Sequence, residues 1–142
     1  MKSFHLKILE AEQSFYEGDC VSLIIPTLDG QYGVLADHYN AVAPVVPGVL
    51  QYTTPDGETT TCAVSNGIIK TEDNEVLVLV ETAELPEEID ANRAKRAEAA
   101  AKEALLQKRS IREYHDAQAK LARAISRLRV KDRYAAKRGN RR

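Results

Sequence analysis

The chain has 142 residues, of which 44% are hydrophobic and 29% are charged, and its formal net charge is −1. This composition is typical of a soluble globular protein with one ordinary domain or two small ones, and no apolar run approaches the roughly 20 residues that a transmembrane helix needs. The N-terminal residues lack the apolar core of a signal peptide, so we expect a cytosolic protein. The two cysteines, Cys20 and Cys62, lie in apolar runs without CxxC spacing. They predict buried reduced thiols rather than a disulfide or a zinc site.

The small net charge hides a sharp division near residue 83. Residues 1–82 hold three lysines, no arginine and twelve acids, a formal charge of −9. Residues 83–142 hold seventeen Lys and Arg and nine acids, a formal charge of +8, and residues 87–138 contain neither Gly nor Pro. We therefore expect an acidic sheet domain (1–83), a basic helical hairpin (87–138) and a basic tail (139–142), with different partners for the two halves.

The first half reads as a small all-β domain. Alternating apolar residues at 4–8 predict a half-buried strand, and the β-branched run at 21–25 predicts another that stops at Pro26. Residues 55–57 and 72–74 are turn sequences between strand-like runs and predict two hairpins. Several short strands at close spacing indicate a β-sandwich or barrel.

Residues 30–44 combine glycines with two tyrosines and His38. One interpretation is a loop between strands in which backbone groups satisfy His38. The other is a protein-contact loop, because Tyr and His supply rigid amphipathic contact area. The spacing of Ser22, Ser65 and His38 does not favour a hydrolytic site.

The basic half begins with Pro86 among acidic residues, which predicts the start of a helix running from about residue 87 to 107. Four alanines at spacings of three and four form a stripe that Ile89 and Leu105 extend; they are Ala94, Ala97, Ala101 and Ala104. Such a stripe permits close approach of another helix but buries little area.

Ser110 and Glu113 form a capping-box pattern, so we expect a break near Lys108 and Arg109 and then a second helix. Its apolar stripe is Ile111, Tyr114, Ala117, Leu121, Ile125 and Leu128. Two long helices with a short break predict an antiparallel hairpin. Because its seam buries little apolar surface, we expect the hairpin to be weakly held and able to change partner.

Arg123 and Arg127 are four residues apart and share one helix face. They form either a solvated basic face with ordinary ion pairs or a compact anion site, because arginine forks suit phosphate oxygens. The chain has no Gly-rich phosphate loop, so neither a P-loop nor a dinucleotide fold is supported. The basic tail lacks interleaved aromatics and makes a weak case for nucleic-acid binding.

The order of these features resembles the epsilon subunits of bacterial F-type ATP synthases over nearly the whole chain. In the helical half, residues 89–94 read Ile-Asp-Ala-Asn-Arg-Ala and fit the I/L-D-x-x-R-A motif with which some members bind ATP. In the sheet half the resemblance rests on residues 33–35, His38 and residues 43–48, 63–67 and 76–80. It implies an N-terminal β-sandwich followed by a C-terminal two-helix hairpin.

The resemblance also implies a function. Such a chain would be a non-catalytic rotor subunit of the central stalk that couples the catalytic head to the c-ring in proton-driven ATP synthesis. Its sandwich would contact the gamma subunit and the c-ring, and its mobile hairpin would reach the alpha and beta subunits and inhibit ATP hydrolysis. It would be peripheral on the cytoplasmic face of the bacterial cell membrane, with no required cofactor or metal and with ATP as a regulatory ligand. The alternative is a stand-alone nucleotide-responsive binding module; a small β-fold enzyme would need an acid–base or metal set that the sequence does not show.

The resemblance assigns roles to particular residues. The implied ATP site consists of Glu84, Ile89, Asp90, Arg93, Ala94, Arg123 and Arg127. The implied contacts to gamma and the c-ring are Gln31, Tyr32 and His38, and those to the catalytic head are Arg123, Arg127 and Arg129. Three departures stand out: Ala100 replaces an arginine of ATP-binding relatives, Ala36 and Asp37 replace Pro-Gly, and Gln31 replaces a common acid.

Overall fold

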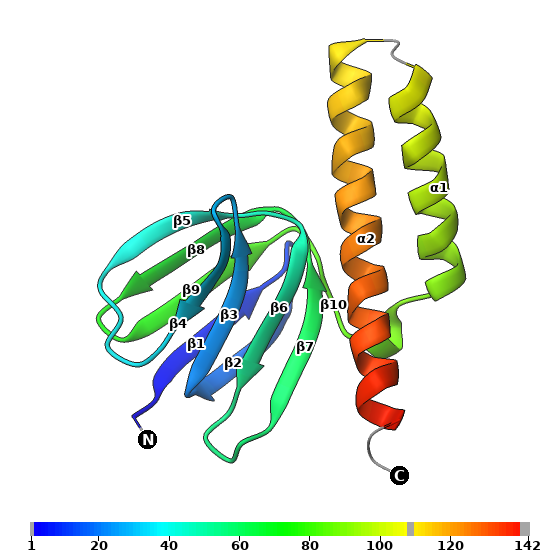
Figure 1. Ribbon diagram of the computed structural model, residues 1–142. Coiled ribbons are helices and arrows are strands. Elements are labelled where there is room, and N and C mark those ends of the chain that lie inside the picture. Colours follow the sequence, from blue (N-terminus) through cyan, green and yellow to red (C-terminus); the bar gives the residue numbers. More distant parts are fainter. Residues whose placement is uncertain (1, 108–109, 140–142) are drawn as a thin grey trace.

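The computed structural model describes residues 2–107 and 110–139. Its first part is a sandwich of short strands, and two long helices lie along one side of it (Figure 1). The strands are β1 Phe4–Leu9, β2 Ser14–Cys20, β3 Ser22–Thr27, β4 Gly30–Val34, β5 Ala41–Val45, β6 Gly48–Thr53, β7 Thr59–Val64, β8 Gly67–Glu72, β9 Glu75–Val80 and β10 Ala83–Glu84. The helical elements are the 3₁₀ turn η1 Pro86–Glu88, α1 Ala91–Gln107 and α2 Ile111–Gly139.

All ten strands belong to one hydrogen-bonded sheet that folds over into two layers. Its order is β10-β7-β6-β3-β5-β8-β9-β1-β2, with β4 paired to β3. The pairing of β1 with β9 is parallel, and it joins the start of the domain to its last long strand. The inward side chains of both layers form one apolar core, with the period of two that strands impose. The predicted sandwich or barrel is confirmed.

The two predicted hairpins are confirmed and have the expected turn chemistry. Gly57 has φ +89° between β6 and β7. Asp73 and Asn74 have φ +52° and +64° between β8 and β9. Positive φ at both central residues is what a two-residue type I′ hairpin turn requires. Asn and Asp tolerate this region better than other side chains do.

Two expectations for the sheet were wrong. Residues 30–44 are not one loop, because β4 and β5 occupy most of the segment and only residues 35–40 connect them. Pro26 does not end the third strand but lies within β3. The pairing of β3 with β6 ends at Ile24, two residues before the proline. Strand β6 therefore needs no hydrogen bond from the N–H group that Pro26 lacks. The carbonyl of Pro26 accepts the N–H of Val46 instead.

The first helix starts later than the sequence predicted. Residues 86–88 form η1, the chain is extended at Ile89, and α1 begins at Ala91. The carboxylate of Asp90 accepts the N–H of Arg93 at 3.1 Å and caps this helix. The predicted cap at Ser110 is confirmed, since its hydroxyl accepts the N–H of Glu113 at 3.1 Å. The predicted break at residues 108–109 lies outside the described residues.

Helix α2 packs against β6 and β7 on one side and against α1 on the other, so it lies between the sandwich and α1 (Figure 1). This position corrects the predicted stripe. Ile111 is 79% exposed near the tip, whereas Ser126 and Val130, which the stripe omitted, are buried. Gly139 belongs to α2, and the other residues of the predicted tail lie outside the described ranges.

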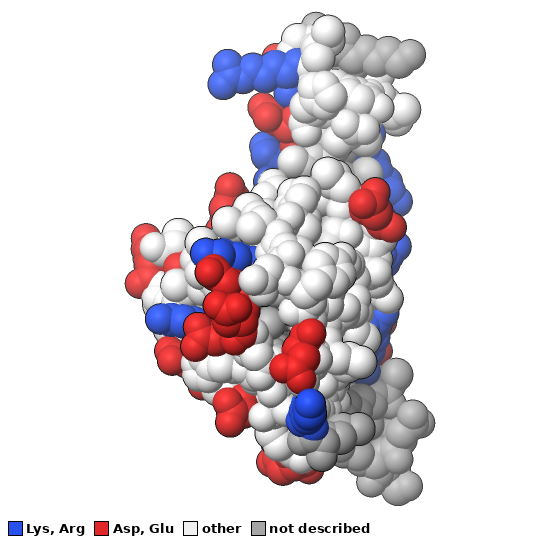
Figure 2. All heavy atoms as spheres, turned by 90° about the vertical axis from the view of Figure 1, so that its left-hand side faces the viewer, with Lys and Arg blue, Asp and Glu red and all other residues white. Residues whose placement is uncertain are grey.

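Cys20 and Cys62 are buried and unbonded, as predicted. Of the helices in the described ranges, none has the length and apolar character to cross a membrane. Figure 2 shows acidic side chains spread over the outer face of the sandwich around a broad area that carries no charge.

Candidate functional site

The hairpin is attached to the sandwich by a small apolar cluster at the base of α2. Val130 of α2 is fully buried and packs with Val49 of β6, Ala63 of β7 and Ile89. Ile89 therefore anchors the start of the hairpin to the sheet. Full burial of such aliphatic side chains stabilises the junction by about 1.5–3 kcal/mol each.

Polar contacts next to this cluster fix α2 in register on the sheet. The hydroxyl of Ser126 donates to the carbonyl of Gly48 at 2.6 Å. Arg127 donates from Nε to both carboxylate oxygens of Glu84, at 3.1 and 3.0 Å, and from Nη2 to Oε1 at 2.7 Å. We call these two contacts, Ser126–Gly48 and Arg127–Glu84, the helix clamp. Because Glu84 lies in β10, which pairs with β7, the clamp ties α2 to a strand and not to a free linker.

We expect Arg127→Gln to weaken the association of the hairpin with the sandwich by about 1–2 kcal/mol. This is the range for hydrogen bonds between charged groups, reduced because solvent reaches both side chains. Energy transfer between dyes on cysteines introduced at Asp56, in the β6–β7 turn, and at Asp132, in α2, should fall as the helix leaves the sheet. Arg129→Gln removes the same charge from an exposed position two residues away and should leave the signal unchanged.

The native thiols do not compete for the dyes. Burial raises the pKa of Cys62 to about 12 and also raises the pKa of Cys20, so both remain protonated and shielded at neutral pH. The double variant Glu84→Gln, Arg127→Gln leaves no unpaired charge and should recover part of the lost signal. Equal signals from Arg127→Gln and Arg129→Gln would show that the clamp does not hold the helix.

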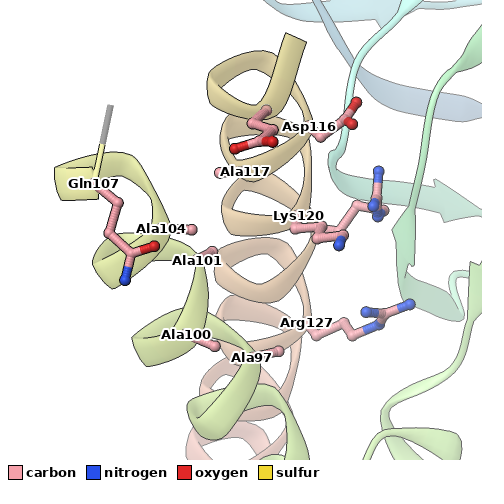
Figure 3. A pocket seen from close by; sticks show the side chains of 11 residues that line it. Ala97, Ala100, Ala101, Ala104, Gln107, Asp116, Ala117, Lys120 and Arg127 are labelled. Carbon is pink, nitrogen blue, oxygen red and sulfur yellow. The ribbon is translucent and has the colours of Figure 1, made fainter. Parts of the chain in front are cut away.

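A groove of about 450 Å³ runs between α1 and α2 above the clamp. Four alanines line it on the α1 side, namely Ala97, Ala100, Ala101 and Ala104. On the α2 side it is lined by Glu113 and Asp116 toward the tip of the hairpin, and by Lys120, Arg123 and Arg127 toward its base. In Figure 3, Lys120 and Arg127 leave α2 on the same side, away from the alanines of α1.

The structure brings together only part of the ATP site that the sequence implied. Arg123 and Arg127 line the groove, and both also border a small cleft with Glu84. Ile89 is in the apolar junction, and Asp90 caps α1. The first turns of α1 also hold Arg93, which is exposed, and Ala94, which is 3% exposed. These four residues do not line the groove.

Sequence reasoning missed two polar residues of this region. Ser126 is a buried hydroxyl in the middle of a helix, and nothing in its local sequence indicates a partner 78 residues away. Lys120 lies three residues before Arg123, so helical spacing alone would have placed it on the arginine face.

Of the three residues that the resemblance assigned to contacts with gamma and the c-ring, the structure brings two, Tyr32 and His38, into contact with each other. Nδ1 of His38 donates to the carbonyl of Tyr39, and Nε2 lies 2.7 Å from the hydroxyl of Tyr32. The hydrogen bond with Tyr39, helped by burial, raises the pKa of Tyr32 to about 12, which keeps this phenol neutral. Gln31 is exposed on β4 and bonds to neither ring among the described residues. A backbone carbonyl thus satisfies His38, as the first interpretation expected, and its ring also contacts Tyr32 and Tyr39; the second interpretation, a protein-contact loop, stays a prediction.

The connection 35–40 is also braced against the β8–β9 turn. The N–H of Asp37 donates to the side-chain oxygen of Asn74 at 2.7 Å, and the N–H of Asp73 donates to that of Asn40 at 3.0 Å. Asp37 has φ +62°, a backbone region that glycine adopts without strain and that aspartate tolerates better than most side chains. The loop presents Leu35 and Tyr39, which are 63% and 69% exposed, from a fixed backbone.

The architecture defines a two-part protein in which a basic helical hairpin packs on an acidic β-sandwich. Two family models match it in that order: the beta-sandwich domain of the ATP synthase Delta/Epsilon chain over residues 3–86, and its long alpha-helix domain over residues 87–132. The chain therefore belongs to the ATP synthase delta/epsilon family.

Curated relatives and solved structures agree with this assignment. The chain is 38% identical to the ATP synthase epsilon chain of Caldanaerobacter subterraneus subsp. tengcongensis over 94% of its length and 96% of the relative. It is 38% identical to that of Ruminiclostridium cellulolyticum over 94% and 98%. The fold is shared with a chain of the Euglena gracilis mitochondrial ATP synthase, solved as OSCP/F1/c-ring, with a TM-score of 0.79 and 21% identity over 87% of this chain and 78% of that one.

Proposed function

We propose that the chain is the epsilon subunit of a bacterial F-type ATP synthase. It is a non-catalytic subunit of the central stalk, which couples the catalytic head to the c-ring in proton-driven ATP synthesis and limits ATP hydrolysis through its hairpin. The observation that carries this proposal is the match of both domains, in order, to relatives that are named epsilon chains over nearly their whole length. The complex holds it at the cytoplasmic face of the bacterial membrane as a peripheral subunit.

In this proposal the sandwich binds the gamma subunit and the c-ring through the loop 35–40 and its neighbours Gln31, Tyr32 and His38. The support is the hydrogen-bonded ring cluster, the braced backbone and the exposed apolar side chains of the loop. A rigid loop loses little entropy on binding, so its apolar contacts translate into affinity.

We expect the chain to form a 1:1 complex with the gamma subunit and Leu35→Glu to weaken that complex by about tenfold or more, because a charge would be buried at the interface. Leu28→Glu is the matched control. Leu28 is 73% exposed at the other end of β4, so the same substitution should leave the affinity unchanged. Titration calorimetry or co-purification measures both.

Absence of binding to gamma at micromolar concentration would contradict the rotor assignment and favour a module that acts outside a synthase. Equal weakening by Leu35→Glu and Leu28→Glu would keep the assignment but remove the loop from the interface.

Regulation in this proposal follows from two positions of the hairpin. In the docked position, which is the one in the structure, Arg127 is engaged by Glu84. On release, Arg123, Arg127 and Arg129 become available to acidic segments of the alpha and beta subunits, and opposite charge guides the approach. ATP, as a regulatory ligand, would favour the docked position only to the extent that it binds that position more tightly.

A further inference from the structure

Strand β10, which carries Glu84 of the helix clamp, is held by the sandwich along both of its edges. Toward β7, the N–H of Thr82 donates to the hydroxyl of Ser65 at 2.8 Å, and the carbonyl of Thr82 accepts the N–H of Ser65 at 3.1 Å. The next N–H, that of Ala83, donates to a carboxylate oxygen of Glu10 at 2.8 Å. Because consecutive N–H groups of a strand point to opposite edges, Glu10 lies on the edge of β10 that faces away from β7.

Glu10 reaches this edge from a distant part of the sheet. It follows β1 directly, and β1 and β10 lie near opposite ends of the strand order. A second observation places its charge beside β7: burial raises the pKa of the Cys62 thiol, and the carboxylates of Glu10 and Glu88 raise it further. Ala83 is buried, so without Glu10 its N–H would lose the acceptor that the structure gives it.

We propose that Glu10 is a positioning residue for the hairpin: it keeps β10 on the sheet, so that Glu84 meets Arg127. Backbone pairing of β10 with β7 involves only Ala83 and Glu84, which offers few hydrogen bonds to hold a strand. Loss of the Glu10 contact lets both residues leave β7, and Glu84 is then no longer fixed opposite Arg127. This inference rests on the two hairpin positions of the proposed function and names a residue that sets the balance between them.

The test compares variants of the full-length chain that carries the dyes at positions 56 and 132. Glu10→Ala should lower the ratio of docked to released hairpin by about tenfold, the effect of one lost hydrogen bond to a charged group. Glu12 is an exposed acid of the same connection between β1 and β2, so Glu12→Ala removes an equal charge and should change the ratio by less than about twofold. Glu10→Gln keeps an oxygen acceptor and should stay close to the parent.

Two further measurements separate positioning from general stabilisation of the sandwich. If Glu10 acts through the helix clamp, Glu10→Ala should have little additional effect in the double variant Glu84→Gln, Arg127→Gln. Hydrogen exchange in Glu10→Ala should quicken at the amides of Ala83 and Glu84, while the strands β1 and β9 keep their protection.

Three results would overturn the role of Glu10. They are equal signals from Glu10→Ala and Glu12→Ala, a full effect of Glu10→Ala in the double variant, and faster exchange throughout the sandwich. The rotor assignment would stand in each case, because it is tested by binding to gamma.

If energy transfer falls as expected, Glu10→Ala should also lower ATP hydrolysis by the assembled complex, because the released hairpin is the inhibitory one in the proposed function. Unchanged hydrolysis would then contradict the regulation proposed for the hairpin. The positioning role of Glu10 would still be supported by the energy transfer of the isolated chain, so the two failures are distinguishable.

Discussion

Deleting residues 87–142 should raise the ATPase activity of the assembled complex severalfold without preventing assembly. The deletion removes both helices and their excess of positive charge, while it leaves every strand of the sandwich and the connection 35–40 in place. The contact that opposes hydrolysis is thereby lost, but the proposed docking surface is kept. The measurement is the steady-state hydrolysis rate of the complex reconstituted with either form.

Two controls make the result specific. Removing only residues 140–142 leaves α1 and α2 intact and should keep hydrolysis low, which separates the hairpin from the basic end of the chain. The difference between full-length and truncated complexes should shrink at high ionic strength if charge attraction brings the hairpin to the head. Equal hydrolysis rates with and without the hairpin at low salt would refute an inhibitory role.

Gly67→Ala should destabilise the sandwich by at least about 3 kcal/mol, a large share of the stability of a small domain. A methyl group at this position would lie 1.8 Å from the carbonyl oxygen of Leu79 and 2.8 Å from the Cα of Val80. Both atoms are backbone, and Gly67 is paired with Val80 on one side and Val45 on the other. Neither neighbouring strand can move away without breaking its own ladder. Urea unfolding followed by circular dichroism measures the change.

Gly33→Ala is the matched control within the same sheet. No atom lies within 4 Å of the position that its new methyl group would occupy, so its stability should stay within about 1 kcal/mol of the parent. Similar losses for Gly67→Ala and Gly33→Ala would mean that chain flexibility, and not the approach of β9, explains the first result.

Local patterns were enough to predict much of the sheet. β1 alternates Phe4, Leu6 and Ile8 inward, and the two hairpins carry their turn residues. β2 was missed because it lacks a regular alternation of apolar and polar residues. One of its inward positions is Gly18, and the ring of Tyr16 fills the space beside this glycine. β10 was missed because two residues carry no period, and its pairing with β7 depends on the rest of the sheet.

The candidate site was harder to predict from the sequence, because it also depends on contacts between distant segments. Helical spacing placed Arg123 and Arg127 on one face, but it could not show that Glu84, 43 residues away, engages only one of them. Nor could it show that α2 lies between two partners and buries Ser126 and Val130 toward the sheet. These features arise from packing between segments distant in the chain, on which local periodicity has no bearing.

Because β10 is part of the sheet, the hairpin can pivot only beyond Glu84, close to the wall of the sandwich. From such a fixed base the length of the helices sets how far the arm can act. Residues 91–139, if drawn out into a single continuous helix, would span about 70 Å. A subunit anchored at one end of a rotating shaft could then touch a surface that lies far from its own sandwich. Shortening α2 by whole turns would measure how much of that reach is needed.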